Sequence, residues 1–575
     1  MLVVVFVTIV LAQFILRPND AEKVAESGLW SVLSMANIYF WLFQDTSYFA
    51  AASNEKPLLH LWSLGVEEQF YIFWPLILLV THRIGHGKYF FLICSFMAMS
   101  SYLLGEYLFS YSPSFVYYML PARAGELLIG ALLAQFLLKK GGLLIPEIQI
   151  MLIALSGFVL ITGSLFFLSE DEVFPGLRAI PPTIGTAMLI FAGHFGNSFI
   201  TRLLKLKPMT WIGLISYSAY LWHWPMLAFY NYGQSEITLL AGIIIFSLTV
   251  FLAWFSYLYI ETPARYSQKS AIQIFVNQLI LPSAAIAILA IGLMKIDGYG
   301  LRWISEDFKS SLVTLRDEIR PAYEYDYVCQ SQIIKQIDVS NPNCVVGAES
   351  DIPPHTILWG DSNAAHYIGI IGSFAKESGF RFRNLQIGSC PPIDADASIY
   401  VNAKRAADCR DSRKIAIQTV NEHQVVIISA NWPSYQSRSD QFMGVFFETV
   451  QSLVSQGKLV ILVGKAPIIS TYDRLCREKA MSFPLITCDV PSVPLATKVT
   501  NANERLKRFA LQTKNVEYYD FNKYLCPNGM CSVYDNNGKL MYYDSSHLSL
   551  SASWQIGNNI HKENGVPFPF TLISD

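Results

Sequence analysis

The stretch ILWGDSN, residues 357–363, begins as a short apolar run and ends in Gly360-Asp361-Ser362. Similar apolar or β-branched runs recur through the C-terminal half of the chain, and they are typical of buried strands in a parallel sheet. The runs are TILWG (356–360), VVIISA (425–430), LVILVG (459–464) and VEYYDF (516–521). Helical segments are predicted between or beside them, near 364–378, 411–422, 440–456 and 498–513. We therefore predict a three-layer α/β domain over residues 351–575.

Ser362 follows the first of these strands, and active sites of parallel α/β domains lie beyond the carboxyl ends of the strands. A nucleophilic serine needs a base, and the base needs a group that orients it. In YYDSSHLS (542–549), Asp544 and His547 are three residues apart, so one turn can direct both side chains to one point. Each motif alone could be a chance match or a surface loop. Their order along the chain favours Ser362 as nucleophile, His547 as base and Asp544 as the orienting carboxylate.

Eight of the nine cysteines lie in the C-terminal half, whereas Cys94 lies in an apolar run. An even number of cysteines in an exported domain indicates disulfides. Many connectivities are possible, and free buried thiols are the alternative. No Cys/His spacing is tight enough to indicate zinc, so no metal site is predicted. Pairing of sequence neighbours would join Cys329 with Cys344, Cys390 with Cys409, Cys476 with Cys488, and Cys526 with Cys531.

The N-terminal half is too apolar for a soluble domain. The chain is only 15% charged, against about 25% in soluble proteins, and the deficit lies in residues 1–300. Its apolar runs approach the roughly 20 residues that cross a bilayer. We predict about nine helices in a membrane domain over 1–296. The first run lacks the basic region and cleavage site of a signal peptide, so it is predicted to remain as a membrane helix. They lie near 1–17, 60–81, 89–109, 118–138, 149–168, 178–194, 210–230, 237–260 and 276–296.

Lysine and arginine are concentrated in alternate connecting loops. The loop 169–177 is acidic, and other loops between the basic ones are poor in both residues. By the positive-inside rule the basic loops are cytoplasmic, which places the N-terminus inside and residues 300–575 outside. Residues 297–350 are expected to pack on the exported domain as an extension. The net charge of −2 gives no indication of a nucleic-acid partner. The basic loops contain Arg83 and Lys88; Lys139 and Lys140; Arg202, Lys205 and Lys207; and Arg265 and Lys269.

Polar side chains within membrane segments are costly, so they are functional candidates by default. They gather in PLLHLWSLGVEEQFYIFWPL (57–76), PARAGELLIG (121–130) and ISYSAYLWHWP (215–225). The alternatives are packing at a helix mouth, an intrahelical ion pair and an interfacial aromatic belt. The candidates are His60, Ser63, Glu67 and Tyr71 near one helical face, Arg123 and Glu126 one turn apart, and His223 between two tryptophans.

LLHLWSLGVEEQFY, supported by NIYFW (37–41) and SYSAYLWHWP, resembles the acyltransferase-3 family of integral membrane acyltransferases over roughly residues 1–270. The resemblance implies that this half takes an acyl group from cytoplasmic acyl-CoA and presents it on the far side of the membrane. The family normally begins with two further helices, the first carrying a basic residue and, eleven positions later, a catalytic histidine. None of the ten histidines here follows that pattern. The resemblance therefore implies that Met1 is a truncated or misassigned start.

The GDS and DxxH motifs together resemble the SGNH hydrolase family over about residues 350–555. CPP (390–392) and HLS (547–549) are similar to the subgroup that is fused to acyltransferase-3 domains. The resemblance implies an oxyanion hole made from the backbone N–H of Ser362, a glycine and an asparagine side chain, which stabilise charge in the tetrahedral intermediate. Asn431, in SANWPSY, and Gly388, in QIGSCPP, are the candidates, although either could be a turn residue.

The two resemblances imply an O-acetyltransferase of the bacterial inner membrane with a periplasmic C-terminal domain. Acetyl-CoA would be the acyl donor, with no bound cofactor, and the acceptor would be an envelope polysaccharide. Lipopolysaccharide O-antigen is the first expected acceptor and peptidoglycan the second. Two other classes stay open. One is an exported, membrane-anchored carbohydrate acetylesterase, and the other is a transporter or scaffold with an inactive hydrolase-like domain.

Overall fold

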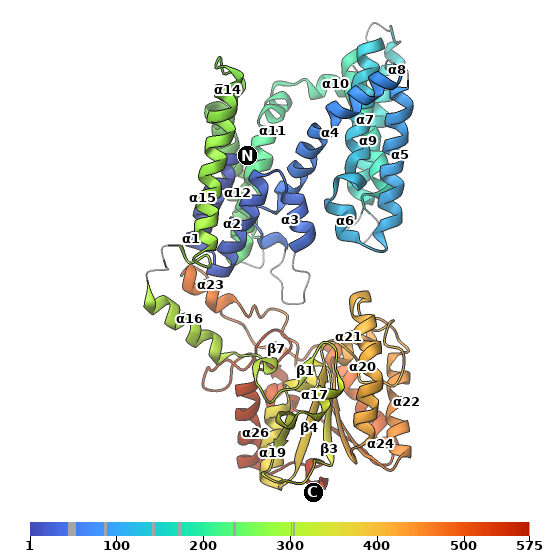
Figure 1. Cartoon of the computed structure of the whole chain (residues 1–575), viewed down its shortest axis with the longest axis vertical. Helices are drawn as coiled ribbons and strands as arrows, with labels where there is room; N and C mark the ends of the chain where they lie inside the picture. Colours follow the sequence, from blue (N-terminus) through green and yellow to red (C-terminus); the bar gives the residue numbers. More distant parts are fainter. Residues whose placement is uncertain are drawn as a thin grey trace. The chain divides into compact units, whose positions relative to one another are not determined.

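The computed structural model describes residues 1–43, 53–85, 89–140, 144–168, 174–196, 198–233, 237–300, 302 and 305–573. Lys88 and residues 169–173 of the acidic loop lie outside the described residues. The chain divides into two compact units, which can be followed along the sequence in Figure 1. The first is Met1–Ser305 with Met481–Ile486, and the second is Glu306–Ala480 with Thr487–Asp575. The domain boundaries predicted at 296 and 350 stay predictions.

The first unit is built from helices, and each of the nine apolar runs coincides with one of them. Two helices that were not predicted, α2 and α3, follow the first run; α2 is polar overall and begins with Pro18 in the first turn, where proline is well tolerated. The helices are α1 (Leu2–Ile15), α2 (Pro18–Val32), α3 (Ala36–Phe43), α4 (Trp62–Gly85), α5 (Phe90–Phe109), α6 (Pro113–Tyr118), α7 (Leu120–Lys140), α8 (Glu147–Phe167), α9 (Ile180–Phe195), α10 (Phe199–Leu204), α11 (Lys207–Gly233), α12 (Leu239–Ser256), α13 (Thr262–Arg265), α14 (Ala271–Ile274) and α15 (Leu281–Met294).

Six helical segments within the described residues are long and apolar enough to cross a membrane. The other three predicted spans are also helical, but α1 and α9 have only 14 and 16 residues, fewer than the roughly 20 that a crossing needs. The six are fewer than the number of spans predicted, and the orientation stays a prediction. The six segments are Leu59–Arg83, Phe90–Phe109, Pro113–Lys139, Glu147–Phe167, Leu239–Arg265 and Ala271–Met294.

Close backbone approach joins two helices of the first unit, α8 and α9. A Cβ atom on Gly157 would lie 2.7 Å from the carbonyl oxygen of Gly185, and one on Gly185 would lie 2.9 Å from the carbonyl oxygen of Gly157. Small residues allow this approach, and close packing is a main source of helix association in a membrane. A larger side chain at either glycine would force α8 and α9 apart.

The second unit contains a mainly parallel sheet. β4, β3, β5, β6 and β8 lie side by side in that order and are all parallel. β1 extends the sheet beside β4, and β2 pairs with β4 in the antiparallel direction. The four predicted strands are confirmed, whereas β4 was not predicted. The strands are β1 (Gln330–Ser331), β2 (Val345–Gly347), β3 (Thr356–Gly360), β4 (Arg381–Ile387), β5 (Val425–Ser429), β6 (Leu459–Val463), β7 (Val493–Pro494), β8 (Val516–Tyr519) and β9 (Met530–Cys531).

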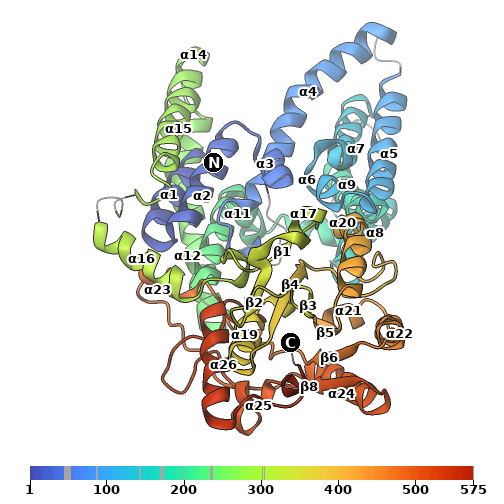
Figure 2. The same cartoon turned by 60° about the horizontal axis from the view of Figure 1, so that its bottom comes forward.

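Helices cover both faces of this sheet, so the predicted three layers are present. Alternate residues of a strand point to opposite faces; Leu358 of β3 joins one apolar core, and Ile357 and Trp359 join the other. Figures 1 and 2 show α19 and α26 on one side of the sheet and α20, α22 and α24 on the other. The helices are α16 (Glu306–Glu318), α17 (Gln336–Ser340), α18 (Ser362–Ala365), α19 (Ile368–Ser378), α20 (Ala403–Asn421), α21 (Trp432–Gln436), α22 (Phe442–Ser455), α23 (Cys476–Ser482), α24 (Thr497–Gln512), α25 (Asn522–Leu525) and α26 (Leu550–Asn564).

All four disulfides join sequence neighbours, as predicted. They are Cys329–Cys344, Cys390–Cys409, Cys476–Cys488 and Cys526–Cys531, and Cys94 is free and buried.

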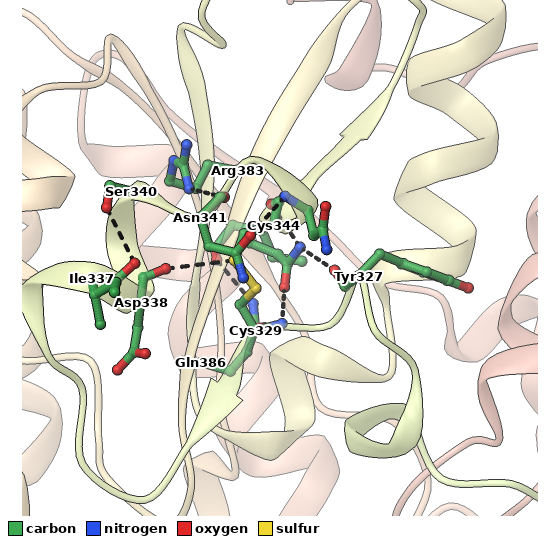
Figure 3. Close-up of a disulfide and its surroundings, with 12 residues drawn as sticks. Tyr327, Cys329, Ile337, Asp338, Ser340, Asn341, Cys344, Arg383 and Gln386 are labelled. Carbon is green, nitrogen blue, oxygen red and sulfur yellow. Dashed lines mark hydrogen bonds between the residues drawn. A yellow bond between two sulfur atoms is a disulfide. The ribbon is translucent and has the colours of Figure 1, made fainter.

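The Cys329–Cys344 disulfide holds the edge of the sheet (Figure 3). The buried amide of Asn384 in β4 accepts from the backbone N–H of Cys329 at 2.7 Å and donates to the carbonyl of Cys344 at 2.8 Å. This contact and the pairing of β1 and β2 with β4 anchor residues 329–347 on the sheet.

We expect the paired substitutions Cys329→Ala and Cys344→Ala to lower the free energy of unfolding of the second unit by about 3 kcal/mol, because the disulfide restricts the unfolded chain. Pulse proteolysis of the full chain in detergent, across a urea series, would measure the change. Cys94→Ala is the control and should leave the urea midpoint of the second unit unchanged. An unchanged midpoint in the paired variant would contradict the stabilising role of this disulfide.

Candidate active site

Ser362 lies at the start of α18, directly beyond the carboxyl end of β3. The strand can end so close to its neighbour only because residue 360 is glycine, since a Cβ atom there would lie 1.8 Å from the carbonyl oxygen of Ser429 in β5. Ser362 is half-buried, and its Oγ lies 2.9 Å from Nε2 of His547. The predicted nucleophile and the predicted base are therefore within hydrogen-bond distance, although they are far apart in the sequence.

Asp544 orients His547 from the other side of the imidazole ring. His547 Nδ1 lies 2.9 Å from Asp544 Oδ2, and Asp544 Oδ1 accepts from the backbone N–H groups of Ser546 and His547 at 2.7 and 2.8 Å. Burial would raise the pKa of Asp544, but His547 and these hydrogen bonds hold it below its usual value. The carboxylate is thus ionised at neutral pH and fixes His547 with Nε2 facing Ser362.

Asp361, which precedes Ser362, is a buried carboxylate that joins two turns. Its Oδ1 accepts from the backbone N–H of Asn363 at 2.8 Å and from Asn363 Nδ2 at 3.1 Å. Its Oδ2 accepts from the backbone N–H of Asn431 at 2.9 Å and from the hydroxyl of Tyr435 at 2.7 Å. Burial, and then the Asp361 carboxylate, raise the pKa of Tyr435 well above its usual value, so Tyr435 remains a donor.

The three predicted oxyanion donors differ in what the structure allows. The backbone N–H of Ser362 is at the first position of α18, where a helix supplies no acceptor of its own. Asn431 follows β5, the strand next to β3, and stays a predicted donor. The backbone N–H of Gly388 already donates to the carbonyl of Ser331 at 2.9 Å. In this structure Gly388 is therefore not available as an oxyanion donor, because its N–H is used to attach β1 to the sheet edge.

Three further residues near the triad were not found from the sequence. Tyr435 holds Asp361, His366 is fully buried 5.8 Å from His547 between ring centroids, and Lys465 is fully buried and donates to the carbonyl of Ser546. None stands in a recognisable motif, and each reaches the site from a different element. A polar residue shortly after a predicted strand is the one signal that could have found Lys465.

The structure brings together three of the membrane candidates. Ser63 Oγ lies 2.5 Å from the hydroxyl of Tyr220, which donates to the carbonyl of His60 at 2.6 Å. The rings of His60 and His223 lie 5.9 Å apart between centroids. Tyr220, in the middle of this cluster, lies in ISYSAYLWHWP (215–225) but is not among the candidates predicted from the sequence. We refer to His60, Ser63, Tyr220 and His223 as the histidine–tyrosine cluster.

The remaining membrane candidates lie outside this cluster. Arg123 pairs with Glu126 at 3.2 Å, one turn away on α7, and its guanidinium lies over the ring of Trp62 at 5.1 Å. The intrahelical ion pair considered from the sequence is therefore present, with an aromatic partner in addition. Tyr71 is 58% exposed, and no hydrogen bond joins it or Glu67 to the histidine–tyrosine cluster within the described part of the chain.

Two protein families match this chain. Residues 2–258 match a family described as an acyltransferase domain, and residues 329–562 match a family described as the SGNH domain that is fused to acyltransferase-3 domains. The two matches follow each other without overlap; the first lies in the helical unit, and the second covers most of the α/β unit. The combination predicted from the sequence is therefore confirmed at the level of both domains.

Proteins similar to this chain carry names of one kind of activity. A Staphylococcus aureus (strain MSSA476) protein named as an O-acetyltransferase is 26% identical over 560 residues, which is 92% of this chain and 82% of that protein. O-acetyltransferase OatA of Staphylococcus aureus (strain NCTC 8325 / PS 47) is 31% identical over 263 residues, 44% of this chain and 43% of that protein. The solved periplasmic domain of a Salmonella ser. Paratyphi A lipopolysaccharide acetyltransferase is 16% identical, with a TM-score of 0.31, over 45% of this chain and 97% of that one.

Two substitutions test the triad. Ser362→Ala and Asp544→Asn should each lower the hydrolysis of p-nitrophenyl acetate by the full chain about 10³- to 10⁴-fold, because they remove the nucleophile or the group that selects the imidazole tautomer. Release of p-nitrophenol in detergent solution measures the rate. Ser437→Ala, an exposed serine whose hydroxyl bonds only its own turn, should retain wild-type activity. Equal rates for Ser362→Ala and wild type would exclude Ser362 as the nucleophile.

The histidine–tyrosine cluster can be tested separately. Tyr220→Phe removes the hydroxyl that contacts Ser63 and the carbonyl of His60. With acetyl-CoA, the donor expected from the sequence, this variant should slow acyl transfer about 10- to 100-fold through loss of positioning. Transfer of radiolabelled acetyl from acetyl-CoA by the full chain in liposomes is the measurement. Tyr217→Phe, one turn earlier on α11, is the matched control. Equal losses in both variants, or none in Tyr220→Phe, would contradict a specific role for the cluster.

Proposed function

We propose that this chain, which belongs to the membrane acyltransferases whose acyltransferase-3 domain is fused to an SGNH domain, O-acetylates a polysaccharide of the bacterial cell envelope. One observation carries the proposal. Ser362, His547 and Asp544 form a continuous hydrogen-bonded chain in a unit that follows an acyltransferase membrane domain. The names of the relatives support O-acetyl transfer as the reaction.

The first half-reaction would acylate Ser362. Its Oγ attacks the carbonyl carbon of an acetyl donor while His547 Nε2 takes the hydroxyl proton. The negative charge that develops on the carbonyl oxygen would be stabilised by the N–H of Ser362 and by Asn431. The tetrahedral intermediate then expels the leaving group, which receives the proton from His547, and an acetyl ester remains on Ser362.

The second half-reaction would transfer the acetyl group to a sugar. A hydroxyl of the glycan attacks the ester carbonyl and gives its proton to His547, and the collapse of the intermediate returns that proton to Ser362. Asp544 stabilises the imidazolium in both halves without taking the proton itself. Water competes with the sugar, so a bound glycan must exclude water from Ser362 for transfer to exceed hydrolysis.

The membrane unit would supply the acetyl group. Acetyl-CoA in the cytoplasm is the proposed donor, and the histidine–tyrosine cluster is the proposed site of acyl handling in this unit. We place the second unit in the periplasm, an oxidising compartment in which its four disulfides can form. Lipopolysaccharide O-antigen is the first proposed acceptor and peptidoglycan the second.

The full chain, reconstituted in nanodiscs, should transfer acetyl from p-nitrophenyl acetate to a purified envelope polysaccharide. Lipopolysaccharide and peptidoglycan would be supplied separately, and mass spectrometry would quantify O-acetylated sugar against free acetate. We expect acetylated glycan that is absent with Ser362→Ala.

Free acetate alone, with both acceptors present, would contradict the transferase and favour the membrane-anchored acetylesterase, because the same triad performs hydrolysis. Loss of both products in Ser362→Ala, with transfer in the wild type, would support the relay through Ser362. Transfer that survives in Ser362→Ala would show that the acetyl group reaches the glycan without this serine.

A further inference from the structure

Lys465 is a charged side chain in the interior of the second unit. It lies two residues beyond β6 and has no exposed surface. Its Nζ donates to the backbone carbonyls of Ser546, at 2.9 Å, and Ala466, at 3.2 Å. Fully buried lysines are rare unless they are paired with a carboxylate, and no carboxylate lies within ion-pair distance of Lys465 among the described residues.

The backbone around Lys465 is held from two other elements. Its N–H donates to Asn503 Oδ1 in α24 at 2.8 Å, and its carbonyl accepts from Asn503 Nδ2 at 3.2 Å and from Asn522 Nδ2 at 3.0 Å. Both asparagines are buried. The side chain therefore starts from a fixed point, and its direction toward Ser546 is a property of the fold.

The carbonyl that Lys465 binds belongs to the turn that carries the base. Ser546 lies between Asp544 and His547, its N–H donates to Asp544 Oδ1 at 2.7 Å, and its Oγ lies 3.1 Å from His547 Nδ1. A shift of this carbonyl would move the orienting carboxylate and the imidazole together. Lys465 contacts neither Ser362 nor the imidazole directly, so any effect on the reaction passes through the turn.

The surroundings of Lys465 contain several other charged or titratable groups. Asp544 and Asp361 attract its charge, whereas Lys498 opposes it. Burial, and then Lys465 and His547, lower the pKa of the fully buried His366 well below its usual value, so His366 is neutral. The groups that interact with its charge are Asp544 of the turn, Asp361 and His366 beyond β3, and Lys498 of α24. One step further out, His547 lies against His366, and Asp520 beyond β8 accepts from Asn503.

Burial lowers the pKa of Lys465 to about 8, against the attraction of the two aspartates. A lysine whose pKa is lower in the folded than in the unfolded chain destabilises the fold below that pKa, where it must be charged. The penalty is relieved as the pH rises from about 8 toward the ordinary lysine value. Residues that cost stability are often retained for function, and this one directs its charge at the turn of the triad.

We propose that Lys465 is a positioning residue for the triad: its ammonium fixes the Ser546 carbonyl, and thereby the Asp544–His547 turn, in the geometry that activates Ser362. The proposal rests on the serine nucleophile of the proposed function.

Lys458 offers a matched control at the opposite end of the same strand. It precedes β6, is also buried, and donates to the backbone carbonyls of Asn421 and His423 at 2.8 and 2.6 Å. Burial lowers its pKa as well. Lys458→Met therefore repeats the loss of a buried ammonium that binds two carbonyls, but at the amino end of the sheet and away from the triad.

The test compares Lys465→Met with Lys458→Met in the full chain in detergent. The rate at which a fluorophosphonate probe labels Ser362 should fall about 10- to 100-fold in Lys465→Met and remain at the wild-type value in Lys458→Met. In Lys465→Met alone, the kcat of p-nitrophenyl acetate hydrolysis should fall while the KM stays at the wild-type value, because Lys465 does not touch the substrate. The thermal unfolding midpoint of Lys465→Met at pH 7 should be unchanged or higher, because an apolar side chain replaces a buried charge.

Other outcomes would overturn the proposal. Wild-type labelling in Lys465→Met, or slower labelling with a lower midpoint and a changed KM, would assign Lys465 a structural role only. If Lys465→Met does not fold, Lys465→Gln, which keeps an N–H donor without the charge, serves instead; failure of both to fold likewise indicates a structural role. Failure of the probe to label Ser362 in the wild type would refute the nucleophile itself, which distinguishes that failure from one confined to Lys465.

Discussion

The buried carboxylate of Asp361 is the contact on which the geometry of the site depends. It accepts four hydrogen bonds from two turns, one after β3 and one after β5. Because β3 and β5 are adjacent and parallel, their carboxyl ends meet at the same edge of the sheet. A buried carboxylate without partners is very costly, so the two turns cannot separate without exposing or stranding this charge. The position of Ser362 relative to Asn431 follows from that constraint.

Three charged side chains, Asp361, Asp544 and Lys465, are buried at this one edge of the sheet. The two carboxylates are each compensated by several N–H or O–H donors, whereas the ammonium is compensated mainly by carbonyl groups. An apolar edge would be easier to stabilise. Concentrating charge there instead provides an environment in which donors and acceptors are already oriented before the reaction, which is the main source of electrostatic catalysis in enzymes.

The two units handle polar chemistry under different constraints. In the second unit, water can reach the carboxyl ends of the strands. Ser362 and His547, which lie there, are therefore only half-buried. In the first unit polar groups must satisfy one another, and Ser63, Tyr220 and the carbonyl of His60 do so within a short distance. Arg123, which pairs with Glu126 and lies over the ring of Trp62, follows the same rule.

Much of the second unit could be predicted because its strands and motifs are encoded by residues that are adjacent in the sequence. Short apolar or β-branched runs identified β3, β5, β6 and β8, and the order of GDS and DxxH singled out Ser362, His547 and Asp544, which the structure joins by hydrogen bonds. β4 was not predicted because Arg381 and Arg383 interrupt the apolar pattern of its sequence, RFRNLQI. Both arginines lie on the part of the strand that is only half-buried. α2 was not predicted because its composition is polar overall, although one face of the helix is buried.

The sequence by itself identified four strands of the parallel sheet and nine apolar runs that are helical in the first unit. It also indicated pairing of neighbouring cysteines as one of many connectivities, and named the serine, histidine and aspartate that could form a triad. The tertiary structure alone decided that Gly388 has no free N–H, that Tyr435 holds Asp361, that Tyr220 joins His60 and Ser63, and that Lys465 faces the turn of the base. The physical reason is that periodicity and motif spacing report on neighbours along the chain. Which distant groups share a hydrogen bond depends on the order and register of the strands and on helix packing.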